Sequence, residues 1–311
     1  MARSHPPTLI TLVTRALREE CGVTRGTRVL LALSGGGDSM ALLHVLARLS
    51  QKQGFSLLAH GVDHGLRAEA ATELDRAQAQ CEALGVAFTR TVLALEQGGN
   101  LQARARDARR AALIAVAEAA GADLIATAHH ADDRAETVLL RLLRGAGPRG
   151  LSVLGPRTGV WIRPQGRARK SDILAHLARH HLAFADDPSN LNARFLRTRV
   201  RTELLPLLEQ LSPQIVGHLC ALADALAVAG DAAVAGVAAV ARQGGSVHAP
   251  LLDDQGVALV LNRAQRLLVG RARTLGQRSA RVSLSHGREL TLDPVTLEPQ
   301  IAAARPRPRK R

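Results

Sequence analysis

A glycine-rich loop follows the apolar run 28–33 and leads into apolar residues at helical spacing. The loop consists of Ser34, Gly35, Gly36, Gly37, Asp38 and Ser39. A glycine turn between a strand and a helix lets successive backbone N–H groups approach an anion, and the helix N-terminus adds its positive end. The two serines can add hydroxyl donors. We therefore expect all six residues to form a phosphate-binding loop.

Asp38 is unusual in such a loop because a carboxylate repels phosphate. It requires a metal ion or a cationic partner, and Mg²⁺ fits because one or two carboxylates plus phosphate oxygens hold this ion. Two familiar nucleotide motifs are excluded. None of the three lysines follows a glycine, as a Walker A loop requires, and Met40 stands where a dinucleotide fingerprint needs its last glycine.

A second polar cluster lies at 129–136. Asp132, Asp133 and Glu136 have the spacing of three and four that places carboxylates on one face of a helix. Such a cluster suits Mg²⁺ or an ammonium group, and it also stabilises a helix N-terminus. His129 and His130 precede it, but no third soft ligand has a convincing spacing, so zinc is not expected there. The three cysteines lie far apart and predict neither a metal cluster nor a disulfide framework.

Basic residues outnumber acidic ones by 41 to 27, which gives a net charge of +14. This surplus indicates a polyanionic partner, although a general bias towards arginine would also produce it. Four arginines fall within eight residues and favour a phosphate track; they are Arg194, Arg197, Arg199 and Arg201. Only 2% of the residues are aromatic, so binding to nucleic acid should depend on phosphate contacts and on salt rather than on base stacking.

Strand-length apolar runs alternate with helical patterns over the first half of the chain. Strands are predicted at 28–33, 55–62, 86–92 and 123–128, and helices at 8–20, from residue 40 onward, at 69–84, 101–120 and 132–144. This alternation indicates an α/β fold with a doubly wound, parallel, Rossmann-like sheet. Ligands bind beyond the carboxyl ends of the strands in such sheets. The glycine loop, residues 62–67 and residues 128–136 should therefore converge.

The pattern changes after residue 150. A strand at 160–163, a helix at 170–181, a turn at 186–190 and a basic helix at 192–205 complete a predicted catalytic domain, residues 1–212. Residues 213–311 are predicted as a smaller, mainly helical or mixed domain. It should contain an alanine-rich helix at 214–242, a helix at 262–275, strands at 282–284 and 289–292, and a basic tail.

The loop resembles the PP-loop of the N-type ATP pyrophosphatases, which cleave ATP between its α and β phosphates. Over about residues 28–213 the further motifs resemble, in order and spacing, the tRNA(Ile)-lysidine synthetases. The motifs are VDHGLR at 62–67, Asn100 with Arg106 and Arg109, HHADDRAET at 129–137, DPSN at 187–190 and the arginine cluster. Thr198 departs from the asparagine usual in that family. Many members also have a longer C-terminal region, whereas this chain should carry only a first small module.

The resemblance implies ATP-dependent ligation of free L-lysine to C2 of the wobble cytidine, position 34, of a CAU-anticodon tRNA(Ile). It implies ATP and Mg²⁺ as cofactors and a tRNA-docking role for 213–311. It assigns Asp38, His129, Asp133, Glu136 and Arg197 to catalysis, with Asp38 and Asp133 also on the metal. Arg194, Arg199 and Arg201 are assigned to RNA, although Arg197 and its neighbours are hard to separate as ligands of phosphate or of the lysine carboxylate.

Two other functions stay open at this point. One is a PP-loop enzyme that thiolates tRNA, and the other is an RNA-binding factor without catalysis. The segment Leu219–Val240 is apolar but alanine-rich and carries Asp224 and Asp231, so no membrane partner is expected. No leader peptide is recognisable, and we expect a cytoplasmic protein. The oligomeric state is undetermined, with a homodimer as one option.

Overall fold

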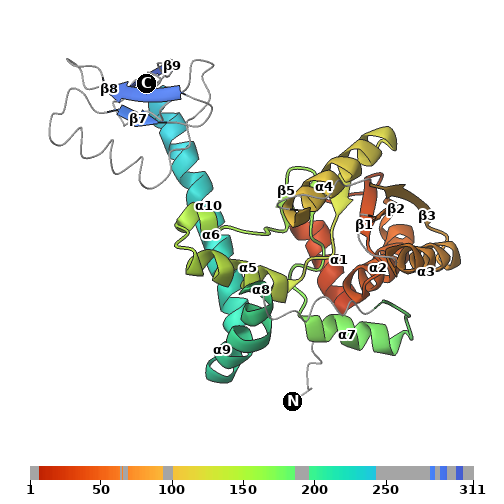
Figure 1. The fold of residues 1–311 in the computed structure, drawn as a ribbon. Coiled ribbons are helices and arrows are strands. Elements are labelled where there is room, and N and C mark those ends of the chain that lie inside the picture. Colours follow the sequence, from red (N-terminus) through yellow and green to blue (C-terminus); the bar gives the residue numbers. More distant parts are fainter. Residues whose placement is uncertain are drawn as a thin grey trace, which may run out of the picture. The chain divides into compact units, whose positions relative to one another are not determined.

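The computed structural model describes residues 7–63, 65, 69–93, 101–185, 196–242 and three strands between 281 and 303. Two compact units divide the chain, Met1–Gly230 and Asp231–Arg311. The first unit contains an open sheet with the strand order β3-β2-β1-β4-β6-β5 (Figure 1). Its strands are β1 (Arg28–Leu33), β2 (Ser56–Asp63), β3 (Ala87–Val92), β4 (Leu124–Ala126), β5 (Arg157–Thr158) and β6 (Trp161–Ile162).

All neighbouring strands are parallel except β5, which pairs antiparallel with β6. The helices of this region are α1 (Leu9–Glu19), α2 (Gly37–Gln53), α3 (Glu69–Ala83), α4 (Leu101–Ala119), α5 (Ala131–Leu143), α6 (Pro148–Leu151) and α7 (Lys170–Arg179). The strands and helices predicted between residues 8 and 144 are confirmed to within one or two residues at most of their ends.

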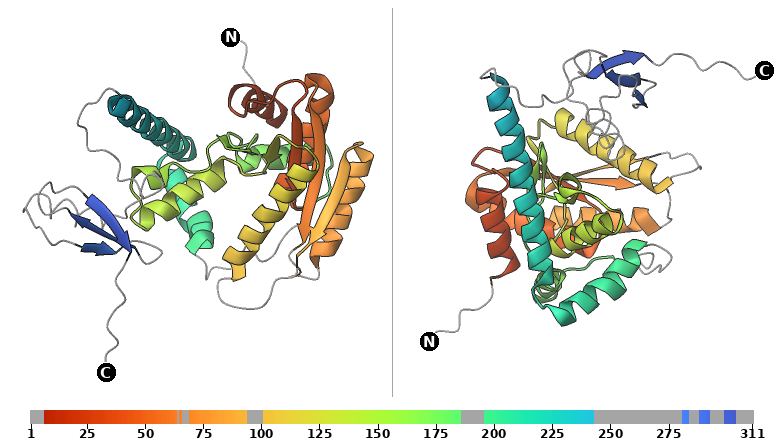
Figure 2. Two further views of the ribbon diagram at one scale, coloured as in Figure 1. Left: turned by 90° about the horizontal axis from the view of Figure 1, so that it is seen from above. Right: turned by 90° about the vertical axis from the view of Figure 1, so that its left-hand side faces the viewer.

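After its exposed first residue, Arg28, β1 is apolar because helices cover both of its faces. Val29 and Leu31 are fully buried in a core shared with α1, α2 and α7, whereas Leu30 between them is buried with Leu113 of α4. Successive side chains of a strand point to opposite faces, so this alternation places α4 on the other side of the sheet, as Figure 2 shows. The predicted doubly wound α/β fold is confirmed.

The chain leaves β1 in one direction to β2 and β3, and returns to the other side of β1 as β4. The carboxyl ends of β1 and β4 therefore flank the point where the strand order reverses, which is where open α/β sheets bind ligands. The glycine loop follows β1 and the His129–Asp133 segment follows β4. The fold alone brings these two segments together.

A second, helical core lies within the same unit. It joins α5 and α6 to the π-helical turn η2 (Val200–Leu204), α9 (Leu205–Leu211) and the first half of α10 (Ile215–Arg242). The short helix α8 (Leu196–Arg199) leads into η2. A basic helix was predicted at 192–205. In the structure the helical chain instead continues through η2 and α9 to Leu211, beyond Pro206. Proline lacks a backbone N–H but fits the first turn of a helix, which is its position in α9.

The second unit contains an antiparallel sheet of β7 (Arg281–Ser283), β8 (Arg288–Leu292) and β9 (Pro299–Ala303), in that order. The strands predicted at 282–284 and 289–292 are confirmed, whereas β9 was not predicted. The predicted helix at 262–275 and the basic tail lie outside the described residues. The division into domains 1–212 and 213–311 stays a prediction.

Within the described ranges, no single helix is long and apolar enough to cross a membrane. One pair, Leu196–Leu211 with Ile215–Ala229, would pass on length and composition together, but it is bent by 98°.

Candidate active site

Internal hydrogen bonds shape the glycine loop. The Ser39 hydroxyl donates to the Gly36 carbonyl at 2.9 Å, accepts from the Ser34 backbone N–H at 3.2 Å, and lies 3.1 Å from the Ser34 hydroxyl. Gly36 is the N-cap residue of α2, and in the described structure no side chain caps that helix end. The N-terminus of α2 therefore opens toward the edge of the sheet where β1 ends, as expected for a phosphate site.

Gly35 is required by its conformation and by its neighbour. Its φ is +79°, and a Cβ atom there would lie 2.7 Å from the backbone oxygen of Glu73. Its carbonyl accepts a hydrogen bond from the Ala185 N–H at 3.1 Å. Gly37 is equally crowded, since a Cβ would approach Phe184 and Leu177 at 3.1 and 3.2 Å. The loop is therefore packed between α3 and the chain around α7.

Asp38 has the cationic partner that its position demands. The Lys170 ammonium, at the start of α7, lies 2.6 Å from one Asp38 oxygen. The other Asp38 oxygen lies 3.7 Å from Nε2 of His130, and an Asp133 oxygen lies 3.4 Å from the same nitrogen. Carboxylates that follow two different strands thus face one buried imidazole.

His130 joins the two strand ends. It is the N-cap residue of α5. Its ring Nδ1 accepts a hydrogen bond from the Asp133 backbone N–H at 3.4 Å, and its backbone N–H donates to the Asp133 carboxylate at 3.2 Å. Burial disfavours the charged ring. The hydrogen bond to Asp132 and the charges of Asp133 and Asp38 outweigh burial and raise the pKa of His130.

Asp133 is ionised despite its burial. Burial opposes the charge, but the interactions with the His130 and His129 rings, the His130 backbone N–H and the Arg197 guanidinium prevail and lower the pKa of Asp133. The Arg197 guanidinium donates to it at 3.3 Å. A carboxylate whose pKa is lowered in this way is suited to holding a cation, either a metal ion or an ammonium group.

Glu136 holds two arginines. Its side chain is 2% exposed and accepts from Nε of Arg197 at 3.1 Å and from Nε and a terminal nitrogen of Arg201 at 2.6 and 3.1 Å. Arg197 and Arg201 lie four residues apart across the start of η2, so both reach the same carboxylate of α5. The structure places Arg201, predicted to contact RNA, beside the acidic cluster.

Asp132 connects α5 to α7. It accepts from the Arg169 guanidinium at 2.9 Å and from the Lys170 backbone N–H at 2.8 Å, and Arg169 also contacts Glu209 of α9. Burial opposes its ionisation, but the hydrogen bonds to His130, Arg169 and Lys170 outweigh burial and lower the pKa of Asp132. The start of α7, and with it Lys170, is therefore fastened to the acidic cluster.

His129 has a different environment from His130. Its Nδ1 lies 2.9 Å from the Thr127 hydroxyl. Burial lowers its pKa to about 4, although the nearby Asp133 charge acts in the opposite direction. His129 is thus a neutral ring at pH 7, beside the cluster, while His130 has the direct approach to Asp38 and Asp133.

Gln165 links the two loops from a fully buried position. Its amide nitrogen donates to the Ala128 carbonyl at 2.8 Å and to the Asp38 carbonyl at 3.2 Å. Its amide oxygen is a buried acceptor without a hydrogen-bond partner in the described structure. Gln165 follows β6, so a third strand end contributes to the same site.

The other predicted RNA-binding arginines are not gathered here. Arg199 points to the surface, where it pairs with Glu203 at 3.0 Å and keeps 60% of its side chain exposed. Arg194 lies outside the described residues, as do His64, Arg67 and Asn100 among the motif residues.

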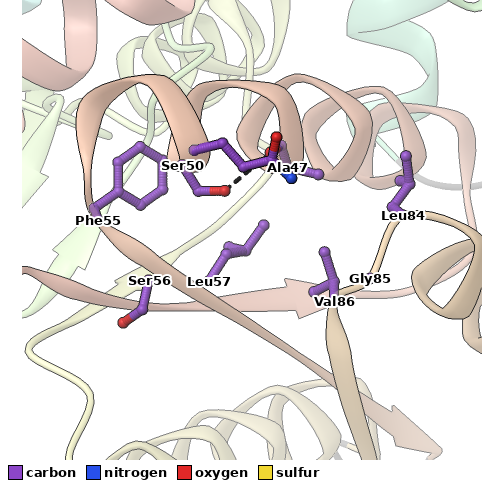
Figure 3. Close-up of a pocket in the computed structure, with 9 residues that line it drawn as sticks. Ala47, Ser50, Phe55, Ser56, Leu57, Leu84, Gly85 and Val86 are labelled. Atoms are coloured by element: carbon purple, nitrogen blue, oxygen red, sulfur yellow. Dashed lines mark hydrogen bonds between the residues drawn. The ribbon is translucent and has the colours of Figure 1, made fainter.

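A hollow of about 200 Å³ lies at the opposite edge of the sheet, lined by the end of α2 and the starts of β2 and β3 (Figure 3). Ser50, Phe55 and Val86 are among its lining residues. The strands begin at this edge, whereas the polar cluster lies where they end. The hollow therefore belongs to no part of the site above.

Several residues of the site were not singled out from the sequence. Lys170, Arg169 and Gln165 come from the chain after β6, and His130 rather than its neighbour faces the carboxylates. Only the rarity of lysine, three residues in the chain, was a signal for Lys170. Contacts of these residues span more than 30 positions of the sequence.

The chain is similar in sequence and in fold to known proteins. The family model of the PP-loop domain matches residues 10–208. A tRNA(Ile)-lysidine synthase of Geobacter sulfurreducens is 40% identical over 222 residues, which are 68% of this chain and 47% of that protein. The enzyme of Xanthomonas axonopodis is 43% identical over 63% of this chain and 45% of its own length. That of Aromatoleum aromaticum is 38% identical over 80% and 59%.

The chain spans about half the length of the first two of these relatives. Among solved structures, a U34-tRNA thiolase from Methanococcus maripaludis has a TM-score of 0.60 at 21% identity, covering 70% of this chain and 79% of that one. At this identity the likeness concerns the fold. The predicted resemblance to the lysidine synthetases is confirmed at the level of sequence, and the match of the PP-loop domain over 10–208 implies ATP binding. With that match over well more than half of its length, the chain belongs to the PP-loop family.

Proposed function

We propose that this protein is a tRNA(Ile)-lysidine synthetase. It activates the wobble cytidine of a CAU-anticodon tRNA(Ile) with ATP and joins free L-lysine to C2 of that base, which changes decoding from AUG to AUA. One observation carries the proposal: Asp38, after β1, and Asp133, after β4, approach the same His130 nitrogen at 3.7 and 3.4 Å. An acidic, cation-binding cluster thus directly adjoins the phosphate loop. The sequence identity to lysidine synthases supports the choice of substrate.

The proposed reaction has two steps. The cytosine O2 attacks the α-phosphorus of ATP, and the bond to the β-phosphate oxygen breaks so that pyrophosphate leaves. The lysine ε-amine then attacks C2, and the C2–O2 bond breaks with release of AMP. An amine with an ordinary pKa near 10.4 must first lose a proton, so an acceptor has to stand close to it.

The residues supply binding and positioning for these steps. The glycine loop and the N-terminus of α2 hold the ATP phosphates, and Lys170 sits beside Asp38 at the same place. Asp133 and Glu136 attract the lysine ammonium, with Asp133 as the best single candidate for the group that holds it. Arg197 contacts both carboxylates, and 43% of its side chain is exposed, so it can also neutralise phosphate or bind the lysine carboxylate.

Mg²⁺ is part of the proposal. The donor set fits this ion, because Asp38 and Asp133 offer carboxylate oxygens from two strand ends, and Mg²⁺ is commonly held by one or two carboxylates together with phosphate oxygens. When bound, Mg²⁺ would neutralise charge on the phosphates. In the structure, Lys170 contacts the Asp38 carboxylate and His130 contacts the Asp133 carboxylate.

The net charge of +14 supports tRNA as the macromolecular partner. A cytoplasmic location is part of the same proposal. Docking of the tRNA on residues 213–311 is part of the same proposal, and a homodimer stays an open option. Deleting residues 231–311 should weaken tRNA binding. Unchanged affinity of the shortened protein would contradict this assignment.

Thiolation of tRNA is less well supported. Burial raises the pKa of Cys21 to about 11 and that of Cys81 to about 12, and it also raises the pKa of Cys220. A sulfur carrier needs an accessible thiolate, whereas all three thiols are buried and protonated. A purely RNA-binding role leaves the acidic cluster beside the phosphate loop without a purpose.

The decisive experiment measures pyrophosphate release from ATP and Mg²⁺, with and without unmodified tRNA(Ile) and lysine. We expect release to require the tRNA and radiolabelled lysine to enter it. Asp133→Asn should abolish incorporation, while Asp107→Asn, at an exposed position of α4, serves as the matched control. Release without lysine incorporation would refute the substrate assignment, and no release would refute catalysis.

A further inference from the structure

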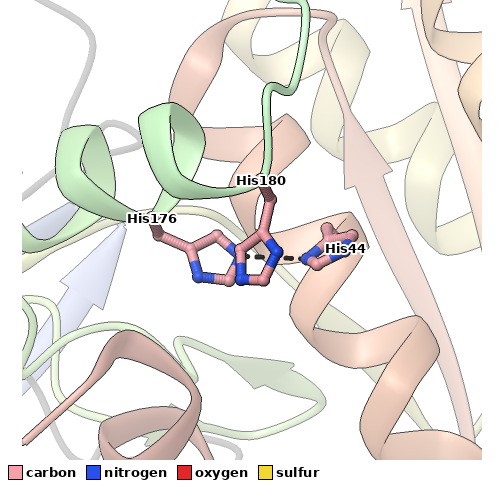
Figure 4. Close-up of side chains that lie close together, drawn as sticks. All are labelled: His44, His176 and His180. Carbon is pink, nitrogen blue, oxygen red and sulfur yellow. Dashed lines mark hydrogen bonds between the residues drawn. The ribbon is translucent and has the colours of Figure 1, made fainter.

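Three histidines from two helices form a cluster away from the acidic site (Figure 4). His44 lies on α2, His176 lies on α7, and His180 is the C-cap residue of α7, four residues after His176. Each offers a ring nitrogen, and the three nitrogens lie within 4.8 Å of one another. Residues 132 positions apart thus present three ligands of one chemical type to a common point.

We propose that His44, His176 and His180 bind a zinc ion that fastens α7 to α2. Imidazole nitrogen is a preferred ligand of zinc, and three histidines with a water as the fourth ligand form a complete tetrahedral site. Two histidines four residues apart on a helix both reach a single ion, and His176 and His180 have this spacing at the C-terminal end of α7. This site is independent of the proposed function and of the Mg²⁺ proposed at Asp38.

The distances suit such a site. His44 Nδ1 and His176 Nε2 are 2.9 Å apart, and the ring centroids of the three pairs lie 4.5 to 5.1 Å apart. Zinc–nitrogen bonds of about 2.0–2.1 Å place the nitrogens of a tetrahedral site roughly 3.3 Å apart. Binding therefore requires the distance between the His44 and His176 nitrogens to increase by a few tenths of an ångström. The most widely separated pair of ring nitrogens must come closer together.

The state of the rings also suits a metal. His44 and His176 are buried, with 8% and 5% of their surfaces exposed. Burial, assisted by the charges of His180 and Arg48, lowers the pKa of both rings, that of His176 to about 4. Neutral imidazole is the form that binds metal. His180 is half-buried, which leaves an approach for the ion from solvent.

The site would act on the glycine loop through α7. Lys170 at the start of α7 pairs with Asp38, Leu177 packs against Gly37, and Ala185 after the helix donates to Gly35. α2 itself begins in that loop. An ion held between His44 on α2 and two histidines on α7 would therefore fix the two helices that bracket the phosphate site.

The test uses the untagged full-length protein, freed of metal and titrated with Zn²⁺ against a chromophoric chelator. We expect one equivalent of Zn²⁺ to bind, a higher thermal unfolding temperature, and no competition from Mg²⁺, which prefers oxygen ligands. His180→Gln should weaken Zn²⁺ binding at least ~10-fold and abolish the thermal shift, because one of three ligands is removed. His218→Gln, at an exposed position of α10, should change neither.

A second variant distinguishes a ligand from a packing residue. His180→Cys replaces the imidazole by a thiolate, which zinc and cobalt also bind. Co²⁺ should then give a sulfur-to-metal charge-transfer absorption that the wild type and His180→Gln lack. Absence of a tight Zn²⁺ equivalent in the wild type would overturn the proposal. So would Zn²⁺ binding unchanged in His180→Gln, or His180→Cys with Co²⁺ and no charge-transfer band.

Discussion

Glu136→Gln removes the charge that holds Arg197 and Arg201 while preserving the shape of the side chain. The carboxylate is 2% exposed and accepts three hydrogen bonds from the two guanidinium groups, at 2.6 to 3.1 Å. A glutamine keeps one oxygen acceptor, but its amide N–H groups would face arginine N–H groups. One or two of the three bonds are therefore lost, because one carboxylate oxygen accepts two of them and the other accepts one.

The expected cost follows from these contacts. A hydrogen bond to a charged group contributes about 1.5–3 kcal/mol, so two of them set an upper limit of about 3–6 kcal/mol. Arg197 and Arg201 are 43% and 41% exposed, so water replaces part of what they lose. We take about 2 kcal/mol as the net destabilisation. For a domain of this size that lowers the melting temperature by roughly 4–8 °C.

Thermal and urea unfolding measure the effect, with Glu203→Gln as the matched control. Glu203 also pairs with an arginine, Arg199, but on the surface, where both side chains are more than half exposed. We expect the control to unfold at the wild-type temperature. A double-mutant cycle of Glu136→Gln with Arg201→Gln should show strong coupling. Equal melting temperatures for Glu136→Gln and Glu203→Gln would refute the reasoning.

The same variant probes the proposed chemistry. Once Arg197 is no longer held against α5, its guanidinium loses the orientation that the site provides. Pyrophosphate release should fall in kcat/KM even at temperatures where the variant is fully folded. Wild-type kinetics in folded Glu136→Gln would mean that these arginines act only on stability.

Three further predictions concern the loop, acid stability and tRNA binding. Gly35→Ala should be destabilised and inactive in pyrophosphate release, because a φ of +79° and a backbone oxygen 2.7 Å from the new Cβ both oppose it; wild-type melting would contradict this. His129 has a folded pKa of about 4, below its ordinary 6.5, so the unfolded state takes up the proton first and stability falls as the pH drops from 6.5 toward 4. His129→Gln should flatten the pH dependence of urea unfolding in that window, and an unchanged slope would show that the ring is not buried neutral. The affinity for tRNA should fall about 10³-fold or more between 50 and 200 mM salt if six or more phosphates are contacted; filter binding that gave a flat response would exclude an arginine–phosphate interface.

The sequence determined the α/β architecture because its signals are local. Apolar runs of strand length alternate with helical spacing, and the runs are apolar on both faces only where a sheet is covered on both sides. The six residues of the glycine loop could be recognised because they are contiguous. The acidic cluster could be recognised because Asp132, Asp133 and Glu136 lie within one turn of one helix.

Only the tertiary structure decided which groups meet across the chain. Lys170 pairs with Asp38 over 132 positions, and Gln165 joins the two loops from a third strand. His130 rather than His129 faces the carboxylates because it is the N-cap residue of α5. Neighbouring side chains at the start of that helix point in different directions. The cluster of His44, His176 and His180 could not be predicted from the sequence either, because each histidine taken alone is an ordinary residue. Sequence spacing reports neighbours on one helix or strand, whereas packing of separate elements determines every contact between them.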